Sequence, residues 1–109
     1  MTEWTTMERL RIYTSEAARI EGMPAHEHIV KAAHAAGLAG ATVFRGIMGY
    51  SGHSVVHTAK ILRLAEDLPI LVEIIDTSDK LDAFYDTELT KLKRCLMIRD
   101  MVSGKVVRS

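Results

Sequence analysis

The sequence predicts an α+β protein of the ferredoxin-like type, with the element order βαββαβ. Three observations support this prediction. Residues 7–14 alternate between apolar and polar side chains, residues 68–76 form an almost continuous apolar run, and residues 24–36 and 78–92 carry apolar side chains at helical spacing. In this arrangement two helices cover one face of a four-stranded antiparallel sheet.

The first half of the chain supplies a strand, a helix and a second strand. The alternation of residues 7–14 has the period of a strand. Pro24 suits the first turn of a helix over residues 24–36, where its missing N–H costs nothing. Gly37 tolerates the backbone conformation that ends a helix. We expect the second strand over residues 40–48.

The second half repeats this pattern in the order strand, helix, strand. Residues 68–76, LPILVEIID, predict a third strand that is buried on both faces. Ser78 can cap the second helix through its hydroxyl group. Residues 96–102 predict the fourth strand. The apolar side chains of the second helix are Leu81, Phe84, Tyr85, Leu89 and Leu92.

Length and composition indicate one small domain. The chain has 109 residues, of which 48% are apolar, and we expect one domain over residues 1–109 with tails at 1–6 and 103–109. The chain has 14 basic residues (Lys and Arg) and 14 acidic residues (Asp and Glu), so its formal net charge is zero. A zero net charge argues against a nucleic-acid partner.

The expected location is the cytoplasm. The single cysteine, Cys95, forms no intramolecular disulfide and fits a reducing compartment, and we expect it to be a partly buried residue where the second helix meets the last strand. No apolar stretch reaches the roughly 18 residues of a membrane span. Residues 1–6 lack the features of a signal peptide.

One face of the predicted sheet has no helix to cover it. Alternation alone places six apolar side chains on this face, and an uncovered apolar face of this kind marks an interface. We therefore expect the protein to associate with itself. The six side chains are Val43, Ile47, Leu71, Ile75, Met97 and Met101.

Four charged residues lie inside predicted strands, and the same alternation places them on the uncovered face. They are Arg11, Arg45, Glu73 and Arg99. A charge buried at an interface needs a partner, so we expect an ion cluster between subunits in which Glu73 pairs with the arginines. The alternative is an anion site that uses the planar fork of an arginine.

Residues 46–66 are the candidate functional segment, because they are too many for a hairpin turn and loops of this length often carry function. Gly46, Gly49 and Gly52 allow a ligand to approach the backbone closely. Lys60 and Arg63 could supply charge for an anion. The alternative is an ordinary surface excursion, since neither GxxxxGK[ST] nor GxGxxG occurs.

The histidines of this segment suggest a second alternative, an acid–base enzyme. His53 and His57 could act with Glu66 or Asp67, although no recognisable catalytic arrangement exists and we assign no catalytic residue. His53 and His57 are four residues apart, but no third ligand is evident, so we expect no metal site and no required cofactor.

Two stretches resemble a known family. They are GLAGATVFRGIMGY at residues 37–50 and HTAKILRLAEDLPILVEIID at residues 57–76. Both resemble the domain of unknown function 190, a family of small bacterial and archaeal proteins with a PII-like fold, and the resemblance extends over residues 8–102. It implies a trimer of three sheets packed around a threefold axis. It also implies that residues 46–66 are the T-loop, a mobile segment over the cleft between subunits.

The resemblance implies a non-enzymatic homotrimeric sensor that binds a small anionic effector, with an adenine nucleotide as the foremost candidate. The implied partner is a protein such as a membrane transporter, and a bare structural trimer is a further alternative. In true PII proteins a glycine- and arginine-rich loop before the second helix helps to bind ATP, whereas residues 76–80 offer only Lys80. The tyrosine motif of true PII loops is not matched around Tyr50. The effector-binding candidates are Gly46, Gly49, Gly52, Lys60, Arg63 and Lys80.

Overall fold

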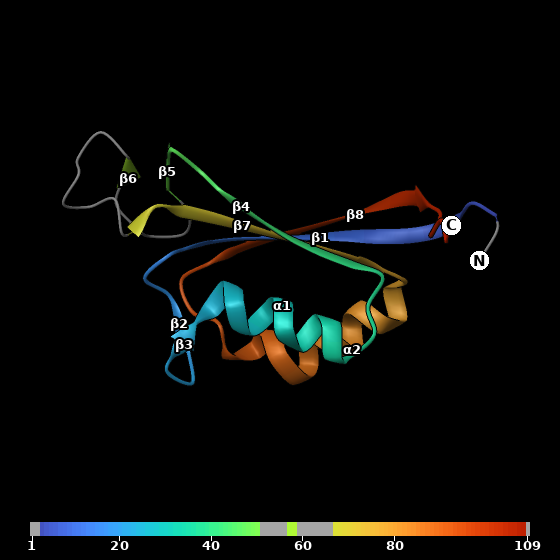
Figure 1. The fold of residues 1–109 in the computed structure, drawn as a ribbon, viewed down its shortest axis with the longest axis horizontal. Coiled ribbons are helices and arrows are strands. Elements are labelled where there is room, and N and C mark those ends of the chain that lie inside the picture. Colours follow the sequence, from blue (N-terminus) through green and yellow to red (C-terminus); the bar gives the residue numbers. More distant parts are fainter. Residues whose placement is uncertain (1–2, 51–56, 59–66, 109) are drawn as a thin grey trace.

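The structure is a computed structural model that describes residues 3–50, 57–58 and 67–108. Its main sheet has four strands in the order β4-β7-β1-β8, all antiparallel to their neighbours. Two helices lie on one face of this sheet (Figure 1). The predicted ferredoxin-like arrangement is confirmed. The elements are β1 (Thr5–Ser15), α1 (Ala25–Ala35), β4 (Gly40–Arg45), β7 (Pro69–Asp76), α2 (Ser78–Glu88) and β8 (Leu96–Gly104).

Five smaller elements were not predicted from the sequence. Strands β2 (Arg19–Ile20) and β3 (Met23–Pro24) form a hairpin whose two turn residues both have positive φ, as tight two-residue hairpin turns require. Strands β5 (Met48–Gly49) and β6 (His57–Thr58) pair with each other. A 3₁₀ turn, η2 (Leu89–Lys91), follows α2. Strands of two residues are too short to show a hydrophobic period.

The hydrophobic core lies between the helices and the sheet. β7 alternates between buried and half-buried residues along its whole length. The expectation that β7 is buried on both faces is therefore wrong for a single chain, because helices cover only one of its faces. The buried core residues are Leu10, Ile12, Ile20, Ala25, Ile29, Ala33, Ile70, Val72, Ile74, Leu81, Phe84 and Leu89.

Strand register shows which side chains lie on the face without helices, here called the open face. Directly opposed residues on neighbouring strands share a face. Leu71 and Ile75 alternate with the buried residues of β7 and lie on the open face, as predicted. Val43 lies opposite the core residue Val72, so its predicted position on the open face is wrong. Ile47 lies beyond the end of β4 and is exposed.

The predicted face of β8 is also wrong. Met97 lies opposite the core residue Ile12, and Met101 lies opposite Glu8, which places both methionines on the face that the helices cover. The open face receives Ile98 instead, because Ile98 lies opposite Arg11. A shift of one residue in the assumed phase moves every side chain of a strand to the other face, and alternation alone does not fix that phase.

Both helices begin and end close to the predicted residues. Gly37 follows α1 with a φ of 74°, the conformation expected where a helix ends. The residue before α2 is Thr77, and Ser78 is the first helical residue rather than the predicted cap. The carboxylate of Asp76 accepts a hydrogen bond from the backbone N–H of Thr77 at 2.6 Å. Among the described residues, no helix is long and apolar enough to cross a membrane.

Candidate functional site

An apolar row crosses the open face from one edge of the sheet to the other. Phe44, Leu71, Tyr13 and Leu96 lie directly opposite one another on β4, β7, β1 and β8. Phe44 and Leu96 are each 49% exposed. In water, apolar side chains of this size favour a partner surface or a ligand.

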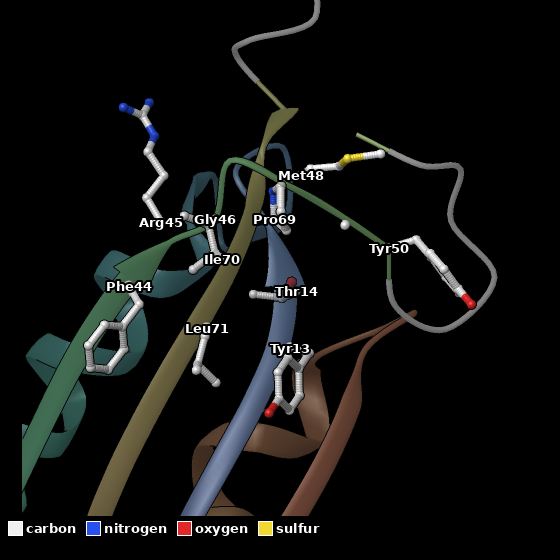
Figure 2. Close-up of a pocket in the computed structure, with 11 residues that line it drawn as sticks. Tyr13, Thr14, Phe44, Arg45, Gly46, Met48, Tyr50, Pro69, Ile70 and Leu71 are labelled. Atoms are coloured by element: carbon white, nitrogen blue, oxygen red, sulfur yellow. The ribbon is translucent and has the colours of Figure 1, made fainter. Parts of the chain in front are cut away.

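A pocket of about 350 Å³ lies at the end of this row, beside the point where β4 leaves the sheet. Gly46, Met48, Gly49 and Tyr50 form part of its lining (Figure 2). The pocket is lined by Tyr13, Thr14, Phe44, Arg45, Gly46, Met48, Gly49, Tyr50, Pro69, Ile70 and Leu71. Three of the six aromatic residues of the chain are in this lining, which is the composition expected of a site for a flat, apolar ring.

The pocket brings together Gly46 and Gly49, two of the residues proposed from the sequence to bind an effector. The backbone N–H of Gly46 donates to the carbonyl oxygen of Pro69 at 2.8 Å. A β-carbon at position 46 would approach Cγ of Pro69 to 2.8 Å. Close packing against Pro69 therefore explains glycine at position 46 without any ligand.

The other predicted effector-binding residues do not join this pocket. Gly52, Lys60 and Arg63 lie outside the described residues. Lys80 is an exposed residue in the first turn of α2, which begins after the far end of β7 (Figure 1). The whole length of β7 separates Lys80 from Pro69 in the pocket.

Arg45 lines the pocket but does not belong to an ion cluster on the open face. It lies opposite the core residue Ile70, on the face that the helices cover. Its Nε donates to Oε2 of Glu16 at 3.0 Å, and its Nη2 also contacts that oxygen. In Figure 2 its guanidinium points away from the side chains of Phe44 and Tyr13.

Arg99 also differs from its predicted placement. It lies opposite Leu10 on the helix-covered face. Its guanidinium binds Glu8, Asp82 at 2.7 Å and the hydroxyl of Ser78 at 3.0 Å. Arg99 therefore ties β8 to α2, and the predicted cluster of four charges is reduced to Arg11 and Glu73.

Two ion pairs do lie on the open face. Arg11 Nε donates to Oε2 of Glu73 at 3.0 Å across β1 and β7. Arg9 binds Asp100 across β1 and β8, with 2.6 Å between Nη2 and Oδ2. The hydrogen bond from Arg9 lowers the pKa of Asp100. Sequence reasoning missed this second pair, although Arg9 alternates in phase with Arg11.

The alternative acid–base site is not assembled among the described residues. His57 lies in β6, and His53 and Glu66 lie outside the described residues. The carboxylate of Asp67 accepts a hydrogen bond from the backbone N–H of Ala17 at 3.1 Å. Within residues 3–50, 57–58 and 67–108, no three His, Cys, Asp or Glu side chains are grouped to hold a metal. Burial raises the pKa of the Cys95 thiol.

Comparison with known families gives a match over nearly the whole chain. The model of the family DUF190, described as "Uncharacterized ACR, COG1993", matches residues 7–104. The chain belongs to the DUF190 family. A UPF0166 protein from Aquifex aeolicus (strain VF5) is 37% identical over 92 residues, which are 84% of this chain and 88% of that protein. A UPF0166 protein from Methanocaldococcus jannaschii is 36% identical over 73 residues, which are 67% of each chain.

Solved structures show that this DUF190 protein has a PII-like fold. CPII, a nitrogen regulatory PII-like protein from Thiomonas intermedia K12, was solved with ADP, AMP and bicarbonate bound. It superposes with a TM-score of 0.69 over 95% of this chain and 92% of CPII, at 11% identity. A second structure of CPII, bound to ADP and bicarbonate, gives a TM-score of 0.67 over 95% of this chain and 93% of that chain, also at 11% identity. At this identity the likeness establishes the fold.

Proposed function

We propose that the protein is a non-enzymatic PII-like regulator that binds an adenine nucleotide in the clefts of a homotrimer. The observation that carries this proposal is the pocket beside residues 46–50, which has an apolar lining with three aromatic side chains. A volume of about 350 Å³ lies within the range of small-molecule sites.

The aromatic side chains favour a nucleobase as the apolar part of the ligand. Tyr13, Phe44 and Tyr50 come from three separate segments and line the same pocket. A base stacked on an aromatic ring gains about 1–3 kcal/mol, which makes such a lining effective for a flat heterocycle. The bound ADP and AMP of the CPII structures are consistent with an adenine base in a protein of this fold.

The phosphates need positive charge or amide donors. Backbone amides of glycine-containing segments can bind phosphate. The N–H of Gly46, however, is already bonded to the carbonyl oxygen of Pro69. Lys60 and Arg63 remain proposed contributors from the part of the chain outside the described residues. Since β7 separates Lys80 from the pocket of its own chain, we propose that Lys80 reaches a site only as the residue of a neighbouring subunit.

The open face supports self-association. It carries the row of Phe44, Leu71, Tyr13 and Leu96, and the two ion pairs of Arg9 and Arg11. The charges of these two pairs already have partners, so their burial avoids the larger cost of a lone buried charge. The threefold arrangement is the one that the resemblance to PII-like proteins implies, and it is part of the proposal.

The regulatory step would be a change in residues 46–66. An effector controls such a segment when it binds one of its states more tightly than the other. The altered segment would then bind or release a partner protein, for which a membrane transporter is the candidate. An acid–base enzyme and a bare structural trimer are the competing functions, and neither predicts specific nucleotide binding.

Isothermal titration calorimetry of the purified protein with ADP, AMP, ATP and GDP tests the proposal. We expect saturable binding of an adenine nucleotide. Tyr50, 70% exposed at the pocket, can be replaced without opening the core. Tyr50→Ala should weaken binding about 5- to 150-fold if the ring stacks on the base.

Tyr85→Ala is the matched control, because Tyr85 is 42% exposed on α2 and does not line the pocket. It should leave nucleotide affinity unchanged. Absence of binding for all four nucleotides at millimolar concentration, or an equal loss in the two tyrosine variants, would reject this site.

A further inference from the structure

One carboxylate holds both ends of the segment that leaves the sheet after β4 and returns at β7. Glu16 follows directly after β1. Its Oε2 accepts a hydrogen bond from Nε of Arg45, the last residue of β4, at 3.0 Å. Its Oε1 accepts a hydrogen bond from the backbone N–H of Leu68, next to β7, at 3.2 Å. We call these two contacts the Glu16 bridge.

The two contacts of the Glu16 bridge differ in kind. The contact to Leu68 is reinforced by the backbone, because the N–H of Glu16 donates to the carbonyl oxygen of Leu68 at 3.0 Å. The contact to Arg45 depends on side chains alone. The side chain of Glu16 is 15% exposed, whereas that of Arg45 is 61% exposed. The guanidinium is therefore the part that an anion from solvent can reach.

Arg45 is also placed to bind an anionic ligand in the pocket. Among the described residues that line the pocket, it alone carries a positive charge. It directly precedes Gly46, and its long side chain can change rotamer, although it now points away from the pocket (Figure 2). The planar guanidinium binds carboxylate and phosphate in the same forked geometry, so the two anions compete for it.

We propose that Arg45 exchanges Glu16 for a phosphate group of the ligand in the pocket. This proposal rests on the proposed function and assigns a regulatory role to Glu16 within the same site. Binding would remove the side-chain contact between Arg45 and Glu16, while the contact from Glu16 to Leu68 and the hydrogen bond from Gly46 to Pro69 stay in place. Occupation of the pocket would thereby change how residues after Arg45 are held.

Competition from Glu16 lowers affinity only for ligands that carry a phosphate. Partly exposed ion pairs contribute modestly, so removal of the competing charge should tighten ADP binding about 1.5- to 5-fold. The affinity for adenosine, which has the same base and no phosphate, should not change.

Calorimetric titration of ADP and adenosine into the wild-type protein and Glu16→Gln measures this difference. Glutamine keeps an oxygen that can accept from Leu68 N–H and removes the charge that holds Arg45. Glu8→Gln is the matched control, because Glu8 is 18% exposed, binds Arg99 at the other end of β1 and gives the same change in net charge. We expect tighter ADP binding in Glu16→Gln and unchanged affinities in Glu8→Gln.

Arg45→Ala, alone and combined with Glu16→Gln, completes a double-mutant cycle. Arg45→Ala alone should reduce the preference for ADP over adenosine, and adding Glu16→Gln to it should have no further effect on ADP affinity. An ADP affinity of Glu16→Gln no higher than wild type would overturn the exchange. So would an equal gain for adenosine, or a gain that persists without Arg45, because a merely structural role of Glu16 would act on both ligands.

Failure of the proposed function gives a different result. If neither ADP nor adenosine binds any variant, the pocket is not a nucleotide site. The exchange of Glu16 for an anion at Arg45 can then be tested separately with inorganic pyrophosphate. Pyrophosphate is titrated into the wild-type protein and Glu16→Gln while the Nε–H signal of Arg45 is followed by NMR. A response at lower pyrophosphate concentration in Glu16→Gln supports the exchange, and no response in either protein overturns it.

Discussion

Gly46 fixes the point where β4 ends and the pocket begins. Its N–H binds the carbonyl oxygen of Pro69, and its lack of a side chain lets the two segments approach closely. The sequence drew attention to Gly46 as a residue that allows close approach. Which group approaches it, the ring of Pro69, could not be predicted, because the two residues are 23 positions apart along the chain.

Replacement of Gly46 by alanine should destabilise the protein. The new methyl group would meet Cγ of Pro69 at 2.8 Å, and such overpacking costs about 1–3 kcal/mol. Gly40→Ala, at the start of β4, is the control, because no heavy atom lies within 4 Å of its β-carbon position. Chemical denaturation measures the free energy of unfolding of both variants. Equal stabilities of the two variants would mean that residue 46 has room for a side chain.

Cys95 should react slowly with alkylating reagents at neutral pH. Burial raises the pKa of its thiol above the ordinary value of 9.0, so little thiolate is present. Lys93 and Arg94 precede it and would have the opposite effect if they stabilised the thiolate. The rate of alkylation by iodoacetamide should still be rising above pH 9. A plateau below pH 9 would show that the nearby cations dominate.

At the scale of elements, hydrophobic periodicity was sufficient to locate both helices and all four strands of the main sheet. It did not determine which face each edge strand presents. Val43 and Met97 were assigned to the wrong face because a strand read one residue out of phase still alternates. The β2–β3 hairpin and the β5–β6 pair were missed, since two-residue strands depend on backbone pairing rather than on side-chain pattern.

Asp76 should contribute strongly to stability, because its carboxylate joins three elements of the fold. It is 4% exposed, and its carboxylate accepts from Ala39 N–H at 2.8 Å and from Thr77 N–H at 2.6 Å. It therefore connects the end of β7 to the starts of β4 and α2. Asp76→Ala should cost about 1.5–3 kcal/mol for each lost bond to the charged group.

Thermal or chemical denaturation of Asp76→Ala checks this expectation. Asp86→Ala, on the exposed surface of α2, is the control for loss of an aspartate and should change stability by less than about 0.5 kcal/mol. An unchanged melting temperature of Asp76→Ala would mean that water replaces the carboxylate at both amides.

At the scale of the whole molecule, counting helices against sheet faces predicted the uncovered face before its residues were known. Periodicity does not reveal the row of Phe44, Leu71, Tyr13 and Leu96, because that row depends on the register of four strands. The pocket was likewise beyond prediction, since its lining comes from three strands and residues 46–50. Of the lining residues, Gly46 and Gly49 were proposed in advance as effector contacts, and Arg45 was named among the arginines of an alternative anion site.

Glu73→Ala should destabilise the assembly more than it would a single chain. Glu73 is 19% exposed beside Arg11, and an interface on the open face would bury both. Loss of Glu73 would then leave a buried arginine unpaired, which should lower the free energy of unfolding by about 3–5 kcal/mol. Loss of a solvent-exposed pair would lower it by about 1 kcal/mol or less. Melting temperature measures the difference. Lys31→Ala, which removes an exposed pair with Glu27, is the control, and equal effects would indicate that the open face is solvated.

Sedimentation velocity with a fluorescent ADP analogue tests the central claim, nucleotide binding by a trimer, most directly. Signal from the analogue should sediment with a species of three times the 12.1 kDa chain mass, and unlabelled ADP should displace it. Tyr50→Ala should reduce the bound signal without changing the sedimenting species. A protein that sediments as a monomer at every concentration, or a trimer that carries no displaceable analogue, would contradict the claim.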